Sequence, residues 1–349
     1  MKKIPVLFAV YVTFFLNLSC SKDKKSMQPD PDGRTVIAVG SFENNAGITV
    51  PAVWVNGVPQ TLGSVEGEAY DLFVSGSDVY VTGYELTGTG SDRVARLWKN
   101  GVGQTLPSGT GYASGEQVYV ANNKVYVLGF DDFSYRTALW VDGVKQAVPL
   151  PAHPYNGGNQ NVGLAVDGTD IYTCGATRNA RGTAKATLMR GGGRMGVDTL
   201  ANTVSHAERI FISGKDVYMV GLEEEGVLVK PRLWKNGQRQ ELDNLPAQGY
   251  MQCVEVENGN VYVVAENRST LAGDELILWK NGKIIHRIPG AGNHLSADGI
   301  SVMDGDVYIC GHESIRTTGE NQIRIWKNGA VQEISPGGGL AVLTNLVVK

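Results

Sequence analysis

The chain has 349 residues, 31 of them basic and 35 acidic, so its net charge is −4 and its length allows one large domain or two. It contains no long run of one charge sign, which argues against a nucleic-acid partner. Glycine is abundant, at 45 residues, and short runs rich in Val and Tyr alternate with Gly, Asn and Asp. This composition indicates many short β-strands joined by turns.

The first twenty residues are typical of a secretory signal. Lys2 and Lys3 precede an apolar run from Ile4 to Leu18, and a polar segment follows Cys20. The apolar run is short for a membrane-spanning helix, which needs roughly 20 apolar residues, and its basic start favours an export signal. We therefore expect a signal peptide at residues 1–19, a linker at 20–33 and a folded domain at 34–349.

The segment LNLSC, residues 16–20, resembles the lipobox of bacterial lipoproteins, in which the cysteine becomes the lipid-bearing N-terminus. Asn17 departs from the aliphatic residue that is usual at its position. The resemblance implies a lipid anchor at Cys20 and a place on the cell envelope at the outer membrane, with the periplasmic or surface side left open. The alternative is an ordinary cleaved signal in which Cys20 is incidental.

The remaining cysteines are Cys174, Cys253 and Cys310, which lie far apart in strand-like apolar runs. No C-x-x-C or Cys/His spacing of a metal site is present. We expect buried reduced thiols, because free cysteine packs as a small apolar side chain.

Two phrases repeat along the chain with a common period. All six tryptophans lie in AVWVNG, RLWKNG, ALWVDG, RLWKNG, ILWKNG and RIWKNG, and TLMRGG is a further copy with Met189 at the Trp position. The copies are separated by 44, 42, 49, 45, 45 and 47 residues. The second phrase, DVYVTG and its variants, places a tyrosine in step with them at residues 80, 126, 172, 218, 262 and 308, and TVIAVG at 35–40 is its degenerate first copy. The pattern predicts seven units.

Each unit predicts four strands, labelled a to d from first to last. In the unit at 68–106, AYDLFV is strand a, DVYVTG strand b, VARLW strand c and GQTL strand d, with a tight Asn-Gly turn between c and d. Seven such units predict an all-β, seven-bladed β-propeller with four-stranded blades. The first unit lacks strand a and the last is followed by GLAVLTNLVV at 339–348, so we expect the C-terminal strand to close the first blade. The repeated aromatic side chains are interpreted as packing between blades.

The longer b-to-c and d-to-a connections belong to one face of such a ring, where function is expected. Acidic residues stand at the predicted starts of four b-to-c loops, and a second set lies near the starts of the inner strands, ten residues before the b-strand tyrosines or close by. The first set is Glu85, Asp131, Glu223 and Glu313; the second is Tyr70, Glu116, His206, Glu208, Tyr250, Gln252, His294 and Asp298. They form a candidate ligand site for a glycan, a peptide or another envelope protein; the alternative is that they only solvate the loops.

Other motifs carry no function. GGGRMG at 191–196 matches a dinucleotide-binding pattern but stands at a predicted hairpin with no helix after it. No nucleophile elbow, phosphate loop or zinc motif is present. We assign no catalytic residue, no cofactor and no metal, and we expect a monomer.

Residues 34–349 resemble a group of β-propeller lipoproteins of the Bacteroidota type, which carry repeated VYVxG and WKNG phrases. The resemblance implies an architecture and no particular activity. Two functions stay open: a binding module on the cell envelope, or a hydrolase or lyase with carboxylates at the central channel mouth. Glu116, Glu208 and Asp298 are the first candidates for the second, if two of them lie roughly 5 to 9 Å apart.

Overall fold

The computed structural model describes residues 33–88, 90–109, 111–132, 137–147, 163–178, 183–268 and 273–349. The predicted signal peptide, Cys20 and all but the last residue of the predicted linker lie outside these ranges. Within these ranges the named secondary-structure elements are all β-strands. The described residues contain no helix that is long and apolar enough to cross a membrane.

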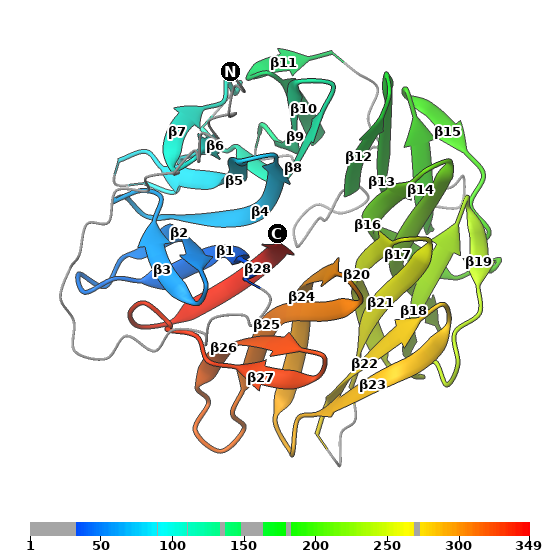
Figure 1. Cartoon of the computed structure of the whole chain (residues 1–349). Helices are drawn as coiled ribbons and strands as arrows, with labels where there is room; N and C mark the ends of the chain where they lie inside the picture. Colours follow the sequence, from blue (N-terminus) through cyan, green and yellow to red (C-terminus); the bar gives the residue numbers. More distant parts are fainter. Residues whose placement is uncertain are drawn as a thin grey trace, which may run out of the picture.

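The strands form seven antiparallel sheets of four, arranged as blades A to G around a central channel (Figure 1). The strands of each blade are named from the inner to the outer one. Blade A is β28 (Ala341–Val348), β1 (Val36–Glu43), β2 (Thr49–Val55) and β3 (Val58–Thr61). Blade B is β4 (Gly67–Ser75), β5 (Asp78–Leu86), β6 (Arg93–Lys99) and β7 (Val102–Thr105). Blade C is β8 (Ser114–Ala121), β9 (Lys124–Phe130), β10 (Thr137–Val141) and β11 (Val144–Gln146). Blade D is β12 (Gly163–Asp167), β13 (Asp170–Arg178), β14 (Ala184–Arg190) and β15 (Gly193–Met195). Blade E is β16 (Val204–Ser213), β17 (Asp216–Glu225), β18 (Leu228–Lys235) and β19 (Gln238–Gln240). Blade F is β20 (Gly249–Glu257), β21 (Asn260–Asn267), β22 (Glu275–Lys280) and β23 (Lys283–Pro289). Blade G is β24 (His294–Met303), β25 (Asp306–Ser314), β26 (Asn321–Lys327) and β27 (Ala330–Gln332).

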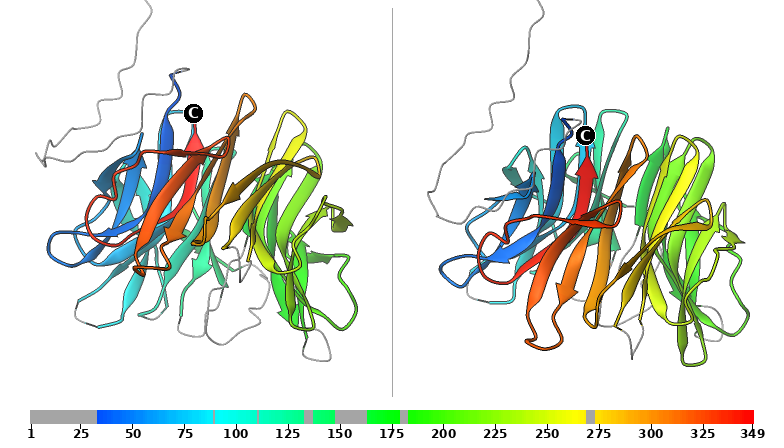
Figure 2. Two further views of the ribbon diagram at one scale, coloured as in Figure 1. Left: turned by 90° about the horizontal axis from the view of Figure 1, so that it is seen from below. Right: turned by 60° about the horizontal axis from the view of Figure 1, so that its bottom comes forward.

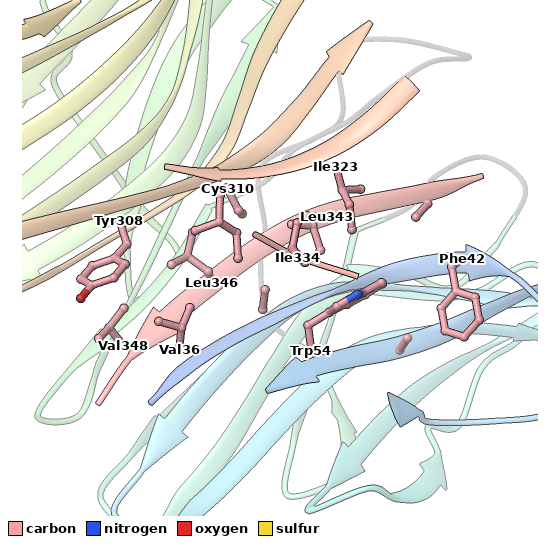
Figure 3. Packing of buried hydrophobic residues seen from close by; sticks show 14 of the residues in the cluster. Val36, Phe42, Trp54, Tyr308, Cys310, Ile323, Ile334, Leu343, Leu346 and Val348 are labelled. Atoms are coloured by element: carbon pink, nitrogen blue, oxygen red, sulfur yellow. The ribbon is translucent and has the colours of Figure 1, made fainter. Parts of the chain in front are cut away.

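The predicted seven-bladed propeller is confirmed, including its closure. The C-terminal strand β28 pairs with β1, so blade A joins both ends of the described chain. Leu343 and Leu346 of β28 pack in one buried cluster with Trp54 of β2 and Cys310 of β25 (Figure 3). This cluster buries the junction between the last blade and the first.

The Asn-Gly turns stabilise the face that carries the a-to-b and c-to-d turns, which we term the tight-turn face. In the turn of blade E, Asn236 and Gly237 have φ of 52° and 78°, a region that favours these two residues. The Asn236 side chain accepts a hydrogen bond from the Val217 amide at 2.8 Å and donates one to Asp216 at 2.8 Å. Lys235 pairs with the same aspartate at 2.7 Å. The two repeated phrases therefore bind each other within a blade.

The tryptophans connect neighbouring blades, as predicted. All six are essentially buried, and the indole of Trp234 in blade E donates to the Asp198 carbonyl, just after the outer strand of blade D, at 2.7 Å. Trp54, Trp140 and Trp279 make the same bond to the segment that leaves the preceding blade. Met189 of blade D has no such donor, and the segment after β11 lies largely outside the described residues.

The other face carries the b-to-c and d-to-a connections, and we term it the long-loop face. Figure 2 shows the ring from the side, with the C-terminal end of β28 at the tight-turn face. Lys349 exchanges two backbone hydrogen bonds with Thr35 at that face, at 2.7 and 3.0 Å. Inner strands therefore run from the long-loop face to the tight-turn face.

The three described cysteines are free and buried, as predicted. Burial raises the pKa of Cys174 to about 12 and raises those of Cys253 and Cys310 further. Their thiols stay protonated near neutral pH and act as apolar packing groups.

Candidate functional site

Six inner strands carry a β-bulge at one common position. The register of β4, β8, β16, β20 and β24 against the next strand skips one residue, and so does that of β28 against β1. A bulge leaves one residue unpaired and redirects its side chain. The residues that the strand register skips, which we term the bulge ring, are Tyr70, Glu116, Glu208, Gln252, Asp298 and Thr344. The matching position in blade D, residue 162, lies outside the described residues.

The side chains of all six ring residues are half-buried. Tyr70 is half-buried whereas Ala69 and Asp71 are buried, and Asp298 is half-buried between buried Ala297 and Gly299. Gln252 and Asp298 line a cavity in the central channel. The structure thus brings five of the predicted site residues into one ring and adds Thr344. The sequence did not reveal Thr344 because β28 is the last strand, and no b-strand tyrosine follows it ten residues later.

A stacked cluster borders the ring at blades B and C. The Tyr70 and Tyr84 rings lie 5.8 Å apart, and the Arg93 guanidinium lies 4.6 Å from the Tyr84 ring and 3.8 Å from that of Tyr112. Cation–π contacts of this kind hold the guanidinium against the tyrosine rings at the long-loop end of the blade. The sequence missed Tyr84, Arg93 and Tyr112 because they come from three different segments.

Glu116 of the bulge ring lies beside this cluster. Burial raises the pKa of its carboxyl to about 7, and the nearby charge of Glu68 acts in the same direction. A hydrogen bond from the Ser114 hydroxyl and the charge of Arg93 oppose that increase. A carboxyl with such a pKa exchanges a proton near neutral pH.

A second polar cluster lies across the ring at blades F and G. The Arg268 guanidinium lies 4.4 Å from the Tyr250 ring and bonds the Glu266 carboxylate at 2.9 Å. Burial raises the pKa of Glu266, and the charge of Asp298 adds to this. The Asp298 carboxylate lies 3.5 Å from His312 and raises the pKa of that imidazole.

Two predicted histidines occupy the same face. His294 is exposed at the start of β24, where its ring nitrogen lies 2.8 Å from the Asp274 carboxylate. His206 is half-buried on β16, two residues before Glu208. Both stand at the long-loop end of an inner strand.

Of the four acidic residues expected to begin the b-to-c loops, Asp131 does so and the other three lie inside strands. Glu85, Glu223 and Glu313 lie inside β5, β17 and β25, and Asp131 directly follows β9. Each pairs with a basic side chain of its own blade: Glu85 with Arg96 at 2.7 Å, Glu223 with Arg232 at 2.7 Å, Glu313 with Arg324 at 2.8 Å, and Asp131 with Lys145. These strands extend past the acidic residue because the arginine of the neighbouring strand compensates its charge. All four carboxylates are therefore held by ion pairs within their own blades, three of them inside a strand.

An ion pair crosses the channel next to the bulge ring. Arg209 of blade E follows Glu208 and reaches Asp71 of blade B at 3.2 Å. The second partner of that carboxylate oxygen is the Asn345 amide at 2.5 Å, and the other oxygen accepts from the Val118 amide at 3.0 Å. The sequence analysis missed this pair, although both residues stand nine places before the tyrosine of their b strand.

Among the residues that the structure describes, no group of three or more His, Cys, Asp or Glu side chains is positioned to hold a metal ion. The polar groups of the channel mouth can instead accept and donate hydrogen bonds to a ligand, while the stacked Tyr and Arg side chains offer flat surfaces.

No family model matches the chain, and no curated protein matches it in sequence. The β-propeller domain of the Trilobed protease from Pyrococcus furiosus covers 90% of this chain and 97% of that domain, at 11% identity and a TM-score of 0.51. An acylaminoacyl peptidase in complex with Z-Gly-Gly-Phe-chloromethyl ketone covers 89% of this chain and 52% of that chain, at 11% identity and a TM-score of 0.50. The acylaminoacyl peptidase of Pyrococcus horikoshii covers 76% of this chain and 46% of that chain, at 12% identity and a TM-score of 0.48.

These likenesses show the fold alone: the chain is a seven-bladed β-propeller. It spans about half the length of the two peptidases, 52% and 46%. The Pyrococcus furiosus domain has an open velcro topology, whereas β28 closes the ring of this chain by pairing with β1.

Proposed function

We propose that this protein is a binding module of the cell envelope, anchored by a lipid at Cys20, which takes its ligand at the channel mouth on the long-loop face. The bulge ring is the observation that carries the proposal. A bulge at the same position of six inner strands turns a polar or aromatic side chain out of the regular alternation in each. Packing alone gives no reason to repeat this device.

The chemistry of the mouth favours a hydroxyl-rich glycan or a basic peptide. Carboxylates predominate there, since Glu116, Glu208 and Asp298 belong to the ring and Glu68 and Glu266 lie beside it. Such groups accept hydrogen bonds from sugar hydroxyls and attract cationic side chains, and the stacked tyrosines offer surface for a planar or ring-shaped group.

Glycan and peptide arrays probed with the purified protein test this proposal. We expect binding to one of these classes, and a loss of at least about tenfold in affinity for Glu208→Ala or Asp298→Ala, as removal of a hydrogen-bonded charge costs more than about 1.4 kcal/mol. Lys215→Ala, at an exposed turn of the tight-turn face, is the matched control. Absence of binding to every class, or binding that neither ring variant changes, would overturn the proposal.

A hydrolase or lyase is the second candidate, and the raised pKa of Glu116 near 7 favours it. Against it, Glu116, Glu208 and Asp298 stand on β8, β16 and β24, so at least one other inner strand separates each pair. Incubation of array-positive ligands with the protein distinguishes the two. An enzyme releases product and loses turnover in Glu116→Gln while it still binds, whereas a binding module returns the ligand intact.

A further inference from the structure

The central channel contains a cavity on the other side of the Asp71–Arg209 pair from the long-loop face. Its volume is about 370 Å³, and the second halves of the inner strands line it, from that ion pair toward the tight turns. This volume lies in the range of small-molecule sites, which is roughly 300–1,000 Å³.

Three aromatic side chains line this cavity at one level. Phe73, Tyr119 and Phe211 stand on β4, β8 and β16, each seven residues before the tyrosine of its b strand. The Phe73 and Tyr119 rings lie 4.8 Å apart and are inclined by 50°. All three are half-buried, which leaves part of each ring open toward the cavity.

Glu255 of β20 occupies the same level of the channel. One of its oxygens accepts a hydrogen bond from the Val302 amide at 3.0 Å. In the part of the chain that the structure describes, no basic side chain pairs with it. Burial raises the pKa of the Glu255 carboxyl to about 8, and the charge of Glu257 adds to this.

The other charged groups of the lining already have partners. The carboxylates are Asp71, Glu255 and Asp298, and the basic residue is Arg209. Asp71 pairs with Arg209 and Asp298 with His312. Glu255 is therefore the carboxyl of the lining without a basic partner among the described residues, so its negative charge is unfavourable until a cation or a proton compensates it.

We propose that this cavity binds a small organic cation, with its ammonium group against Glu255 and its apolar substituents against Phe73, Tyr119 and Phe211. Aromatic faces attract cations through their ring quadrupole, and several rings around one carboxylate suit a quaternary ammonium group. The cavity shares Gln252 and Asp298 with the bulge ring, but the residues proposed to hold the cation lie nearer the tight turns than the ring does.

Calorimetric titration with choline tests the proposal, with 3,3-dimethyl-1-butanol as the neutral probe of the same shape. We expect one choline site and at least about tenfold weaker binding of the neutral alcohol, since cation–π and ionic contacts together exceed about 1.4 kcal/mol. Glu255→Gln keeps an oxygen for the Val302 amide and should remove this preference. Phe211→Leu should weaken choline about fivefold.

Glu241→Gln is the matched control, because this exposed carboxylate directly after β19 does not line the cavity. Equal affinity for both probes, no choline binding at millimolar concentration, or wild-type behaviour of Glu255→Gln would each overturn the proposal.

The pH dependence of the unmodified protein gives a second test that requires no variant to fold. Choline carries its charge at every pH, whereas Glu255 must lose its proton to bind it. Choline affinity should therefore rise up to about tenfold per pH unit from pH 6 toward pH 8 and level off above. The other ionisable groups near the cavity are Asp71, Arg209, Cys253, Asp298 with His312, Tyr119 and Glu257. The choline affinity of Glu255→Gln over the same pH range measures the pH dependence that comes from these other groups. An affinity independent of pH in the wild type would contradict the role of Glu255.

Discussion

At the residue scale, the residue two places before each tryptophan position matches the strand-b side chain that it contacts. Arg96, Arg232 and Arg324 stand two places before a tryptophan, and each binds a glutamate of strand b. Blade D has Thr187 at this place, and its hydroxyl lies 2.9 Å from that of Thr177, at the glutamate position. The arginine of RLWKNG is therefore half of an ion pair inside the blade, and the other half lies eleven or nine residues upstream.

Glu223 provides the sharpest test of this pairing. Its carboxylate is fully buried and bonds Arg232 at 2.7 Å and the Leu200 amide at 2.9 Å. Glu223→Ala should lower the free energy of unfolding by about 3–5 kcal/mol, because it removes one of the two carboxylate partners of the buried Arg232 and leaves the Leu200 amide without its acceptor. The double change Glu223→Thr with Arg232→Thr copies blade D and should restore most of that loss. Urea denaturation measures both, and equal losses in the single and double variants would contradict the pairing.

At the element scale, the inner strands satisfy the backbone of their neighbours around the channel. Side chains of one inner strand accept from amides of the next: Asp71 from Val118, Gln117 from Leu164, Glu255 from Val302, and Ser301 from Val348. The last of these bonds holds β28. The closing strand is thus bound by its sheet partner β1 and by blade G.

Removal of residues 340–349 should therefore open the ring. It exposes the edge of β1 and the apolar surface that Leu343 and Leu346 cover, so we expect loss of cooperative unfolding or a fall of more than about 10 °C in Tm. A peptide of residues 335–349 added in trans should restore the transition, since it supplies the missing strand. The same peptide with Leu343→Asp and Leu346→Asp should not; restoration by both would show that strand pairing alone suffices.

The sequence predicted the architecture and part of the candidate site for the same reason. A fixed spacing from the b-strand tyrosine places a residue at a fixed height in every blade, so Glu116 and Asp298 were found together. The same spacing places Asp71 and Arg209 at one height, but it does not show which blades face each other across the channel, so their ion pair was missed. The loop position predicted for Glu223 was wrong because its partner, Arg232, lies diagonally on the next strand, and that contact keeps both residues inside the sheet.

At the scale of the whole molecule, buried acids make stability depend on pH. Folding raises the pKa of Glu116 to about 7 and that of Glu255 to about 8, mainly through burial. Between their unfolded pKa, about 4.5, and these values the folded protein binds more protons than the unfolded chain, so stability falls as pH rises. The raised pKa of His312 acts in the same direction. Asp78, Asp216, Glu225 and Asp306 have lowered pKa values and remove stability only as pH falls through those values.

We therefore expect the free energy of unfolding to be greatest near pH 5 and to decline by a few kcal/mol toward pH 8. Combining Glu116→Gln with Glu255→Gln should flatten this decline and make the variant more stable than the wild type at pH 8. Denaturation at pH 5, 6, 7, 8 and 9 measures the curve. A wild-type stability that rises over this range would show that these carboxyls ionise in the folded state at their ordinary pKa.

The ion pair across the channel depends on the channel width, and therefore on the number of blades in the ring. Repeat proteins gain and lose units by duplication, and each unit of this chain brings its own turns and, except for the fourth with Met189, a tryptophan that packs against the preceding blade. These local contacts do not depend on how many units the ring contains. Arg209 and Asp71, however, meet at 3.2 Å only across a channel of this width. We expect an eighth blade to widen the opening and separate these two charges, which would remove the stabilisation that the pair gives to the seven-unit ring.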